Sequence, residues 1–148
     1  MTRSLTKAWG ILWAAPATSL GLALACLAFP DGRVQRIDGV VEAHGAWIEW
    51  CLRHLVPIPC GATAITLGHV VLGRDQSALD RTRAHERVHV RQYERWGAFF
   101  IPAYLTASFW MIVTGRDPYL ENPFEREAFR VEMSGQRLNM SGDKSLVA

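Results

Sequence analysis

Two histidines and a glutamate near the middle of the chain have the types and spacing needed to hold a metal and activate water. His85, Glu86 and His89 form a His-Glu-x-x-His pattern. On a helix, side chains four residues apart leave the same face one turn apart, so both imidazoles can bind one divalent metal, typically zinc. Glu86 is offset by about 100°, where its carboxylate can take a proton from a metal-bound water. The pattern predicts metal-assisted hydrolysis.

The residues around this motif favour the helix that the chemistry requires. Ser77 and Asp80 have the spacing of a capping box, which predicts a helix start near Ala78. Neither Gly nor Pro then occurs before Gly97, and glycine is common just after helix ends. The motif therefore lies near the middle of a predicted helix of roughly five turns.

Four arginines repeat every four residues on another face of this helix. Two interpretations stay open: a solvated face with local Glu and Asp partners, or a contact with anionic lipid headgroups. The formal net charge of +2 and the lack of an aromatic platform beside the arginines argue against nucleic-acid binding. The four residues are Arg83, Arg87, Arg91 and Arg95.

A catalytic zinc usually has three protein ligands and keeps one position for water. The other histidines of the chain all precede the motif. A third ligand from a later helix must therefore be a carboxylate, and the candidates are Glu121, Glu125 and Glu127.

The motif, an apolar spacer and then Glu125-Arg126-Glu127-Ala128 resemble the gluzincin zinc metallopeptidases. The likeness is greatest to the membrane-bound prenyl-protein (CAAX) and heat-shock proteases and to the small minigluzincins. In that group the third ligand is the Glu of a Glu-x-x-Ala-Asp motif. Aligning its alanine with Ala128 selects Glu125, with Glu127 as the alternative. The family's Asp falls on Phe129, so its supporting role is missing or supplied by another residue. The resemblance covers roughly residues 63–132.

The resemblance implies a small α+β zincin-like domain that binds Zn²⁺ and hydrolyses peptide bonds, with Glu86 as general base. It also implies that the strand before the metal helix forms the edge of the active site, where an extended peptide adds as a further strand. Residues 63–72 occupy that place. The oxyanion of the reaction can be stabilised by His69, Tyr93 or Tyr119. The predicted substrate-binding strand is Ile65, Thr66, Leu67, Gly68 and His69.

Residues 8–29 carry no charge and, as a helix, span about 33 Å, which is enough to cross a bilayer. Trp9 and Trp13 suit the membrane interface. We predict a retained transmembrane anchor after a cationic N-terminus at residues 1–7. A cleaved signal peptide is the alternative, because Ala23-Leu24-Ala25 offers small residues at a possible cleavage site.

The remaining elements follow from local signals. Asp38-Gly39 between two β-prone runs predicts a hairpin over residues 34–42. Residues 46–56 predict a short amphipathic helix, and the β-branched run at 63–72 predicts one strand with a glycine irregularity. Asn122-Pro123 predicts the start of a later helix. The Ser- and Gly-containing residues 133–148 predict a flexible tail.

The second uncharged run, residues 97–114, lies between the two parts of the predicted zinc site. If it crossed the bilayer once, its ends would be roughly 27 Å apart, and the chain could not return through lipid as an open strand. We therefore predict either a core helix or a helix that dips into one leaflet.

These observations predict a membrane anchor at 8–29 and a zincin-like catalytic domain at 31–132. The predicted function is a membrane-associated zinc peptidase that acts on peptides or proteins. The alternative is a non-catalytic membrane protein whose zincin-like domain is a structural or sensory module.

Overall fold

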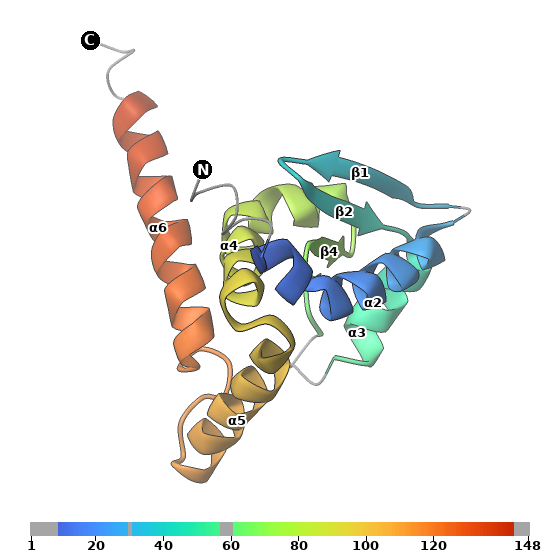
Figure 1. Ribbon diagram of the computed structural model, residues 1–148. Coiled ribbons are helices and arrows are strands. Elements are labelled where there is room, and N and C mark those ends of the chain that lie inside the picture. Colours follow the sequence, from blue (N-terminus) through green and yellow to red (C-terminus); the bar gives the residue numbers. More distant parts are fainter. Residues whose placement is uncertain (1–8, 30, 57–60, 144–148) are drawn as a thin grey trace.

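The computed structural model describes residues 9–29, 31–56 and 61–143 (Figure 1). Its centre is a four-stranded mixed sheet in the order β1-β2-β4-β3. The β1–β2 and β3–β4 pairs are antiparallel, and β2 and β4 are parallel. The predicted α+β class with a small sheet is confirmed, whereas residues 1–7 lie outside the described part. The strands are β1 (Arg33–Ile37), β2 (Val40–His44), β3 (Ala64–Leu67) and β4 (Val70–Gly73).

The first hairpin has the turn that its sequence predicts. Asp38 and Gly39 connect β1 to β2 with φ angles of 50° and 84°. Positive φ at both central residues is the mark of a type I′ turn, whose twist matches that of the flanking strands. The predicted hairpin is confirmed.

The predicted single strand over residues 63–72 is wrong, because the chain reverses at Gly68 and His69 to form β3 and β4. Gly68 has a φ of 61°, and a Cβ at this position would collide with Thr18. The residues after the turn continue the apolar run because all four residues of β4 are buried. A strand that is covered on both faces does not alternate in polarity.

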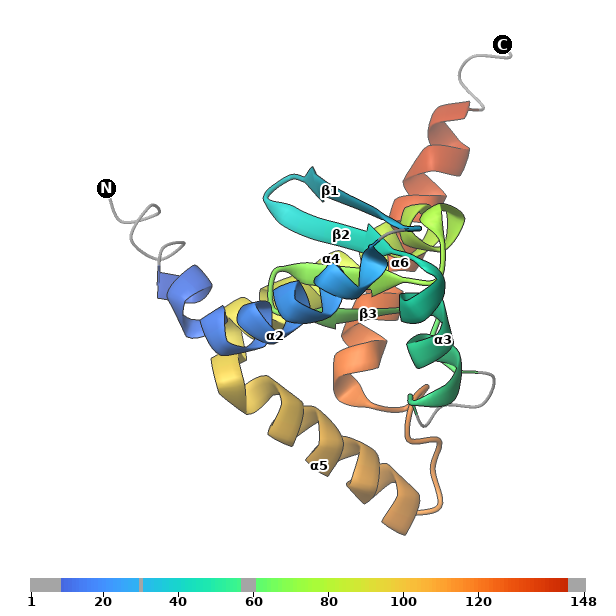
Figure 2. The ribbon, with the colours of Figure 1, turned by 90° about the vertical axis from the view of Figure 1, so that its right-hand side faces the viewer.

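Helices cover both faces of the sheet, and the alternation along β4 shows which helix packs on which face. Val70 and Leu72 pack with Ile48 and Leu52 of α3 (Ala46–His54). Val71 between them packs with Leu79 of α4 (Gln76–Trp96). Because neighbouring side chains of a strand point to opposite faces, α3 and α4 lie on opposite sides. Figure 2 shows α2 (Ala15–Ala25) on the side away from α4.

The anchor predicted at 8–29 takes these residues as one helix, but the described residues 9–29 do not form one uninterrupted α-helix. A helical segment at 9–13 is broken by a turn at Ala14, and α2 continues for only 11 residues before the 3₁₀ turn η1 (Cys26–Ala28). Small residues let α2 approach the sheet closely: a Cβ on Gly21 would lie 2.7 Å from Cβ of Val70. The buried residues of α2 are Ala17, Gly21 and Ala25.

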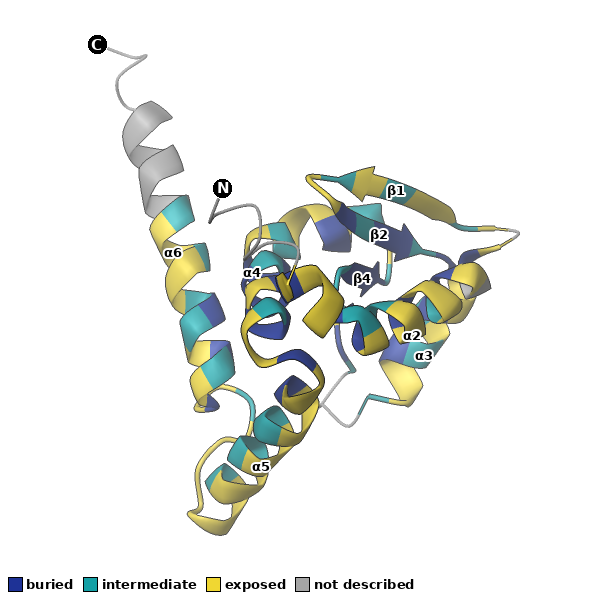
Figure 3. Cartoon of the chain, viewed as in Figure 1, coloured by how far each residue is buried: buried dark blue, intermediate teal, exposed yellow. Residues whose placement is uncertain are grey.

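One continuous helical stretch among the described residues is long and apolar enough to cross a membrane, from Gln76 to Val113. It consists of α4, the 3₁₀ turn η2 (Gly97–Phe99) and α5 (Phe100–Val113). Only Phe100 of α5 is buried, and Figure 3 shows the rest of the helix largely exposed or half-buried. This burial does not fit the core-helix alternative for residues 97–114.

The last helix, α6 (Pro123–Asp143), lies beside α4 (Figure 1). Oδ1 of Asn122 accepts a hydrogen bond from the Phe124 amide at 3.0 Å, so the predicted start is confirmed. The helix continues to Asp143, through most of the predicted flexible tail. Once the first turns are formed, each further residue adds a hydrogen bond without the cost of a new nucleus. Residues 144–148 lie outside the described part.

Candidate metal centre

The helix that carries the motif is present, and its two ends have identifiable causes. Asp75 is extended, and its side chain accepts a hydrogen bond from the Ala78 amide at 2.7 Å. The cap is therefore Asp75, and the predicted capping box at Ser77 and Asp80 is wrong. The Ser77 hydroxyl instead donates to Asp75 at 2.7 Å. Gly97 ends the helix with a φ of 57°, as its residue type predicts.

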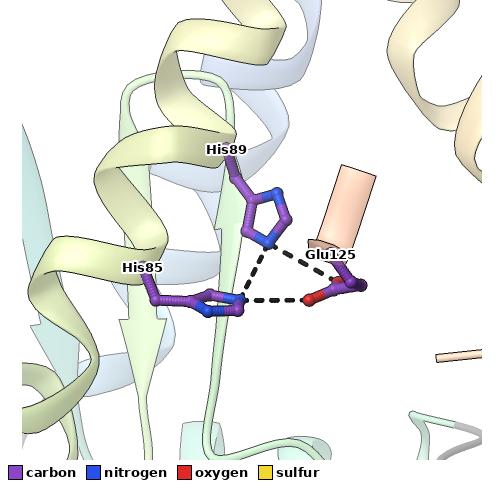
Figure 4. A group of neighbouring side chains, drawn as sticks. All are labelled: His85, His89 and Glu125. Atoms are coloured by element: carbon purple, nitrogen blue, oxygen red, sulfur yellow. Dashed lines mark hydrogen bonds and ion pairs between the residues drawn. The ribbon is translucent and has the colours of Figure 1, made fainter. Parts of the chain in front are cut away.

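His85 and His89 project from one face of α4 towards α6 (Figure 4). Their Nε2 atoms lie 3.1 Å apart, and their ring centroids are 4.9 Å apart. Both residues are nearly covered, with 6% and 7% of their surfaces exposed. The four-residue spacing therefore brings both imidazoles to one point inside the protein.

Glu125, from the first turn of α6, completes this group. Its Oε2 lies 3.1 Å from Nε2 of His85, and its Oε1 lies 3.5 Å from Nε2 of His89. One ligand atom from each of the three residues lies within 4.8 Å of the other two. This buried group can hold a divalent metal ion, because two imidazoles and a carboxylate are metal ligands in proteins.

The other two candidate carboxylates do not join the group. Oε2 of Glu127 accepts a hydrogen bond from Gln92 at 2.9 Å, and its Oε1 lies 3.6 Å from Arg95. Oε1 of Glu121 accepts from the Asp117 amide at 3.3 Å. Glu125 and Glu127 are two residues apart on a helix, so their side chains leave it about 200° apart. Only one of them can face the histidines.

Three further side chains contact the outer atoms of the proposed ligands. Oε1 of Gln92 lies 2.8 Å from Nδ1 of His89, and Oε2 of Glu132 lies 3.4 Å from Nδ1 of His85. The Tyr104 hydroxyl donates to Oε1 of Glu125 at 2.7 Å. Such partners orient metal ligands. Sequence reasoning missed all three, although Glu132 lies seven residues after Glu125, which is two helical turns on the same face.

Electrostatics keeps Glu125 ionised. Burial alone would raise the pKa of its carboxyl, but hydrogen bonds with His85, His89 and Tyr104 outweigh burial and lower the pKa to about 2. Burial would likewise lower the pKa of His89, but Glu125 and the charge of Glu86 reverse this and raise it. A ligating imidazole must be neutral at the bonding nitrogen, so a metal at this site would compete with a proton for His89.

A contact with β3 fixes the side chain of Glu86, the residue after His85 on α4. It is 6% exposed, and its Oε2 accepts a hydrogen bond from the Thr66 hydroxyl of β3 at 2.7 Å. Burial raises the pKa of this carboxyl, while the nearby imidazoles and the Thr66 hydroxyl oppose the change. A raised carboxyl pKa is typical of general acids and bases.

Phe129 stands where the gluzincin resemblance implies an Asp, and its ring packs against the site. The ring of Phe129 meets the ring of His85 edge-on, with centroids 4.9 Å apart. Phe129 thus supports the imidazole by packing, whereas Glu132 supplies the nearby carboxylate.

The three candidates for oxyanion stabilisation lie in different places. His69 is in the β3–β4 turn and not on a strand; its Nε2 lies 3.1 Å from Glu94, and its amide donates to Thr18. It therefore links α2 to α4. Tyr93 is buried against Phe100. Tyr119 is the one close to the site: its pKa is raised by burial and then by the charges of Glu125 and Glu86.

The arginine face of α4 has acidic partners, as one interpretation of the sequence predicts. Nη2 of Arg83 lies 2.7 Å from Oδ1 of Asp80, and Nη2 of Arg95 lies 3.6 Å from Oε1 of Glu127.

The buried carboxylate of Glu42 is a further partner that neither interpretation included. Arg83 donates twice to the carboxylate of Glu42, with both distances 2.9 Å. Nη2 of Arg87 lies 3.4 Å from the same carboxylate and donates to the carbonyl of Ile37. Glu42 belongs to β2 and is 2% exposed. This half of the arginine face therefore attaches α4 to the sheet.

Comparison with protein-family models, with curated proteins and with solved structures finds no match for this chain. The resemblance to the gluzincins stays a prediction from the motif.

Proposed function

We propose that this protein is a zinc-dependent hydrolase of peptide bonds. The observation that carries the proposal is the convergence of His85, His89 and Glu125 on one point, with the buried carboxylate of Glu86 beside it. These residues come from two helices that are separated by α5 in the sequence. A structural role for the two histidines alone would not require a third ligand from α6.

The donor set and its spacing fit zinc. Two imidazoles and one carboxylate are the protein ligands of many catalytic zinc sites, which keep a fourth position for water. Bonds of about 2.0 Å in a tetrahedron place ligand atoms roughly 3.3 Å apart. The Nε2 atoms of His85 and His89 lie 3.1 Å apart, and Oε2 of Glu125 lies 3.1 Å from Nε2 of His85, while the other carboxylate oxygen, Oε1, lies 3.5 Å from Nε2 of His89. Taken as one atom from each residue, the three ligand atoms lie within 4.8 Å of one another.

Zinc held by His85, His89 and Glu125 would polarise the scissile carbonyl and would lower the pKa of the water bound to it towards neutrality. Glu86 accepts the proton of the attacking water and delivers it to the leaving amine nitrogen. Thr66 holds Oε2 of Glu86, so the carboxylate keeps one orientation through both transfers. The hydroxyl of Tyr119 is the candidate donor to the carbonyl oxygen as charge develops there.

The free edge of β3 is the proposed place for an extended peptide. β3 is an outer strand of the sheet, and the bond from the Arg74 amide to the Thr63 carbonyl sets its register with β4. In this register the backbone groups of Ala64 and Thr66 point away from β4. A peptide strand can pair with them beside Glu86. Because Gly68 and His69 form the turn, the proposed substrate strand is shorter than the sequence predicts.

Purified full-length protein tests the proposal through zinc content and hydrolysis of an unstructured protein substrate. Wild-type protein should hold one zinc per chain, and His89→Ala should hold none. Glu86→Gln should keep the zinc and lose at least about 100-fold in turnover. Glu94→Gln is the matched control, because Glu94 is on the same helix but contacts His69. Unchanged hydrolysis by Glu86→Gln would reject the proposal.

A non-catalytic metal module is the second candidate, and the burial of the site favours it. Each of the four residues of the site has no more than 7% of its surface exposed. A structural site has four protein ligands and no exchangeable water. The visible spectrum of cobalt-substituted protein separates the two: sensitivity to added azide indicates an open position and favours the hydrolase. The four residues are His85, Glu86, His89 and Glu125.

We also propose that the protein works at a membrane. The support is the apolar stretch that ends at Val113 and the exposed large apolar residues along it. An anchor that crosses the bilayer over residues 8–29 would require α2 to leave the sheet, where Gly21 packs on Val70. Attachment through exposed apolar residues, with α2 in place, is the form we propose.

A further inference from the structure

The exposed side of α5 is apolar except for Thr106, whose hydroxyl donates to the Pro102 carbonyl of the same helix at 2.7 Å. Residues 96–115 contain no charged side chain. Of the exposed residues, Leu105, Phe109 and Ile112 follow one another at helical spacing, and each is about 60% exposed. Single exposed apolar residues are common on protein surfaces, but a contiguous group marks a contact site. We call Ile101, Leu105, Phe109, Trp110, Ile112 and Val113 the outer face of α5.

The opposite side of α5 is attached to the metal domain. Tyr104 donates to Glu125, and the Asn122 side chain donates to the Tyr104 carbonyl and to the Ser108 hydroxyl at 3.2 and 2.8 Å. The Ser108 hydroxyl in turn donates to the carbonyl of Pro118 at 3.0 Å. The return segment, residues 114–122, therefore runs back along this inner side, and α5 has a polar inner side and an apolar outer face.

The apolar surface continues beyond the helix start. The ring centroid of Trp13 lies 6.2 Å from that of Phe99 and 6.3 Å from that of Trp9. An open hollow of about 460 Å³ lies between the rings of Trp13, Trp96 and Phe99 and the first two turns of α5, and Arg95 also lines it. Tryptophan rings beside a cationic side chain are typical of the level of lipid headgroups.

We propose that the outer face of α5, together with Trp13 and Phe99, binds a lipid bilayer, with α5 lying in the plane of the membrane surface. The apolar side chains enter the boundary between headgroups and acyl chains, which is the depth that interfacial helices reach. Arg95 and Arg116 bracket the uncharged residues and lie at headgroup level. This inference deepens the membrane association proposed above and does not depend on hydrolytic activity.

Two observations favour this orientation over a helix that crosses the bilayer. α5 has 14 residues and is about 21 Å long, and the 3₁₀ turn η2 before it adds about 6 Å, so the two together are still shorter than a hydrocarbon core of about 30 Å. The return segment lies along α5, so crossing would place the exposed charges of Arg116, Asp117 and Glu121 in lipid. Charged side chains are costly to bury in the hydrocarbon core.

Lipid fits this surface better than a protein partner because the outer face offers no charged side chain along its length. Protein interfaces surround an apolar centre with a polar rim that hydrogen-bonds. Here the nearest charges in sequence stand only at the two ends, at Arg95 and Arg116.

Vesicle flotation of the full-length protein tests the inference. Wild-type protein should float with vesicles of phosphatidylcholine and phosphatidylglycerol, and binding should persist in 1 M salt, where the screening length is about 3 Å. Charges introduced by Leu105→Glu with Phe109→Glu should lower the partition coefficient at least about tenfold. Ile112→Glu is a second, single variant. Loss of wild-type binding at high salt, or no binding to vesicles, would overturn the proposal.

The exposed aromatic pair on α3 provides the matched control. Trp47 and Trp50 are 58% and 47% exposed, and their rings contact each other. The double variant Trp47→Glu and Trp50→Glu should bind vesicles like wild type. If this variant loses binding while the α5 variants keep it, α3 is the membrane surface and the proposal is wrong. Circular dichroism and zinc content report whether each variant folds.

Labelling of a single cysteine tests the orientation. Arg116→Cys is placed in a chain whose native cysteines are replaced by serine, and the protein is added to the outside of vesicles. A membrane-impermeant maleimide should label the cysteine of Arg116→Cys as fast as the cysteine of a second variant, Met133→Cys. Met133 is exposed on α6. Protection at residue 116 alone would show that α5 enters or crosses the bilayer end-on, and would overturn the in-plane orientation.

Discussion

Nδ1 of His85 lies 3.4 Å from Oε2 of Glu132, two helical turns beyond Glu125 on α6. The carboxylate is therefore on the side of the imidazole opposite the proposed metal. The gluzincin resemblance implies an Asp at position 129, where this chain has Phe129. Glu132, about one turn further along α6, places a carboxylate next to His85 instead. One helix thus provides both the third ligand and the partner of the first.

The first prediction concerns this carboxylate. Glu132→Gln should weaken zinc affinity about 10- to 100-fold, because the imidazole loses the partner that orients it. Met133→Ala is the control on the exposed side of the same turn. Competition with a chromogenic zinc chelator measures the affinity, and equal affinities for Glu132→Gln and wild type would show that the contact does not support the site.

The second prediction separates the two glutamates at the start of α6. Glu125→Gln should lower zinc affinity at least about 100-fold, because a neutral amide replaces one of three ligands. Glu127→Gln should stay within about threefold of wild type, since this carboxylate contacts Gln92 and Arg95. The same chelator titration applies. The opposite ranking would mean that α6 is rotated from the orientation described here.

The third prediction concerns Glu42, the buried carboxylate of β2. Glu42→Gln should lower the free energy of unfolding by about 3 kcal/mol, because Arg83 and Arg87 lose their shared charged partner. Glu49→Gln removes the exposed pair with Arg53 and should cost less than about 1 kcal/mol. Urea unfolding of the metal-free proteins measures both. Equal effects would indicate that Glu42 is accessible to water.

The fourth prediction distinguishes the observed helix cap from the predicted one. Asp75→Ala should lower the melting temperature by a few degrees at neutral pH, whereas Ser77→Ala should have the smaller effect. The Ser77 hydroxyl and then the Ala78 amide lower the pKa of Asp75 below 3.8. Its stabilisation is therefore present above that pH and is lost as the pH falls through the lowered pKa. The difference between Asp75→Ala and wild type should become smaller as the pH falls below 3.8, as thermal melts at several pH values can show.

Local signals in the sequence predicted three features correctly, although the local capping box at Ser77 and Asp80 was wrong because Asp75 caps the helix. The spacing of His85 and His89 placed both imidazoles on one helical face, Asp38-Gly39 predicted the first hairpin, and Asn122-Pro123 predicted the start of α6. Each depends on backbone geometry over a few residues. Such geometry is the same in any fold.

Tertiary packing decided the rest, because a contact between distant segments leaves no local trace. The run at 63–72 carries no turn signal beyond Gly68 itself, and the close approach of Thr18 to Gly68 is visible only in the structure. The small residues of α2 suit a bilayer and a sheet equally well in composition, and the sheet is where they pack. Gln92, Tyr104 and Glu132 reach the histidines only because α5 and α6 fold back on α4. The choice of Glu125 over Glu127 has the same origin, since the rotation of α6 about its axis is set by what it packs against.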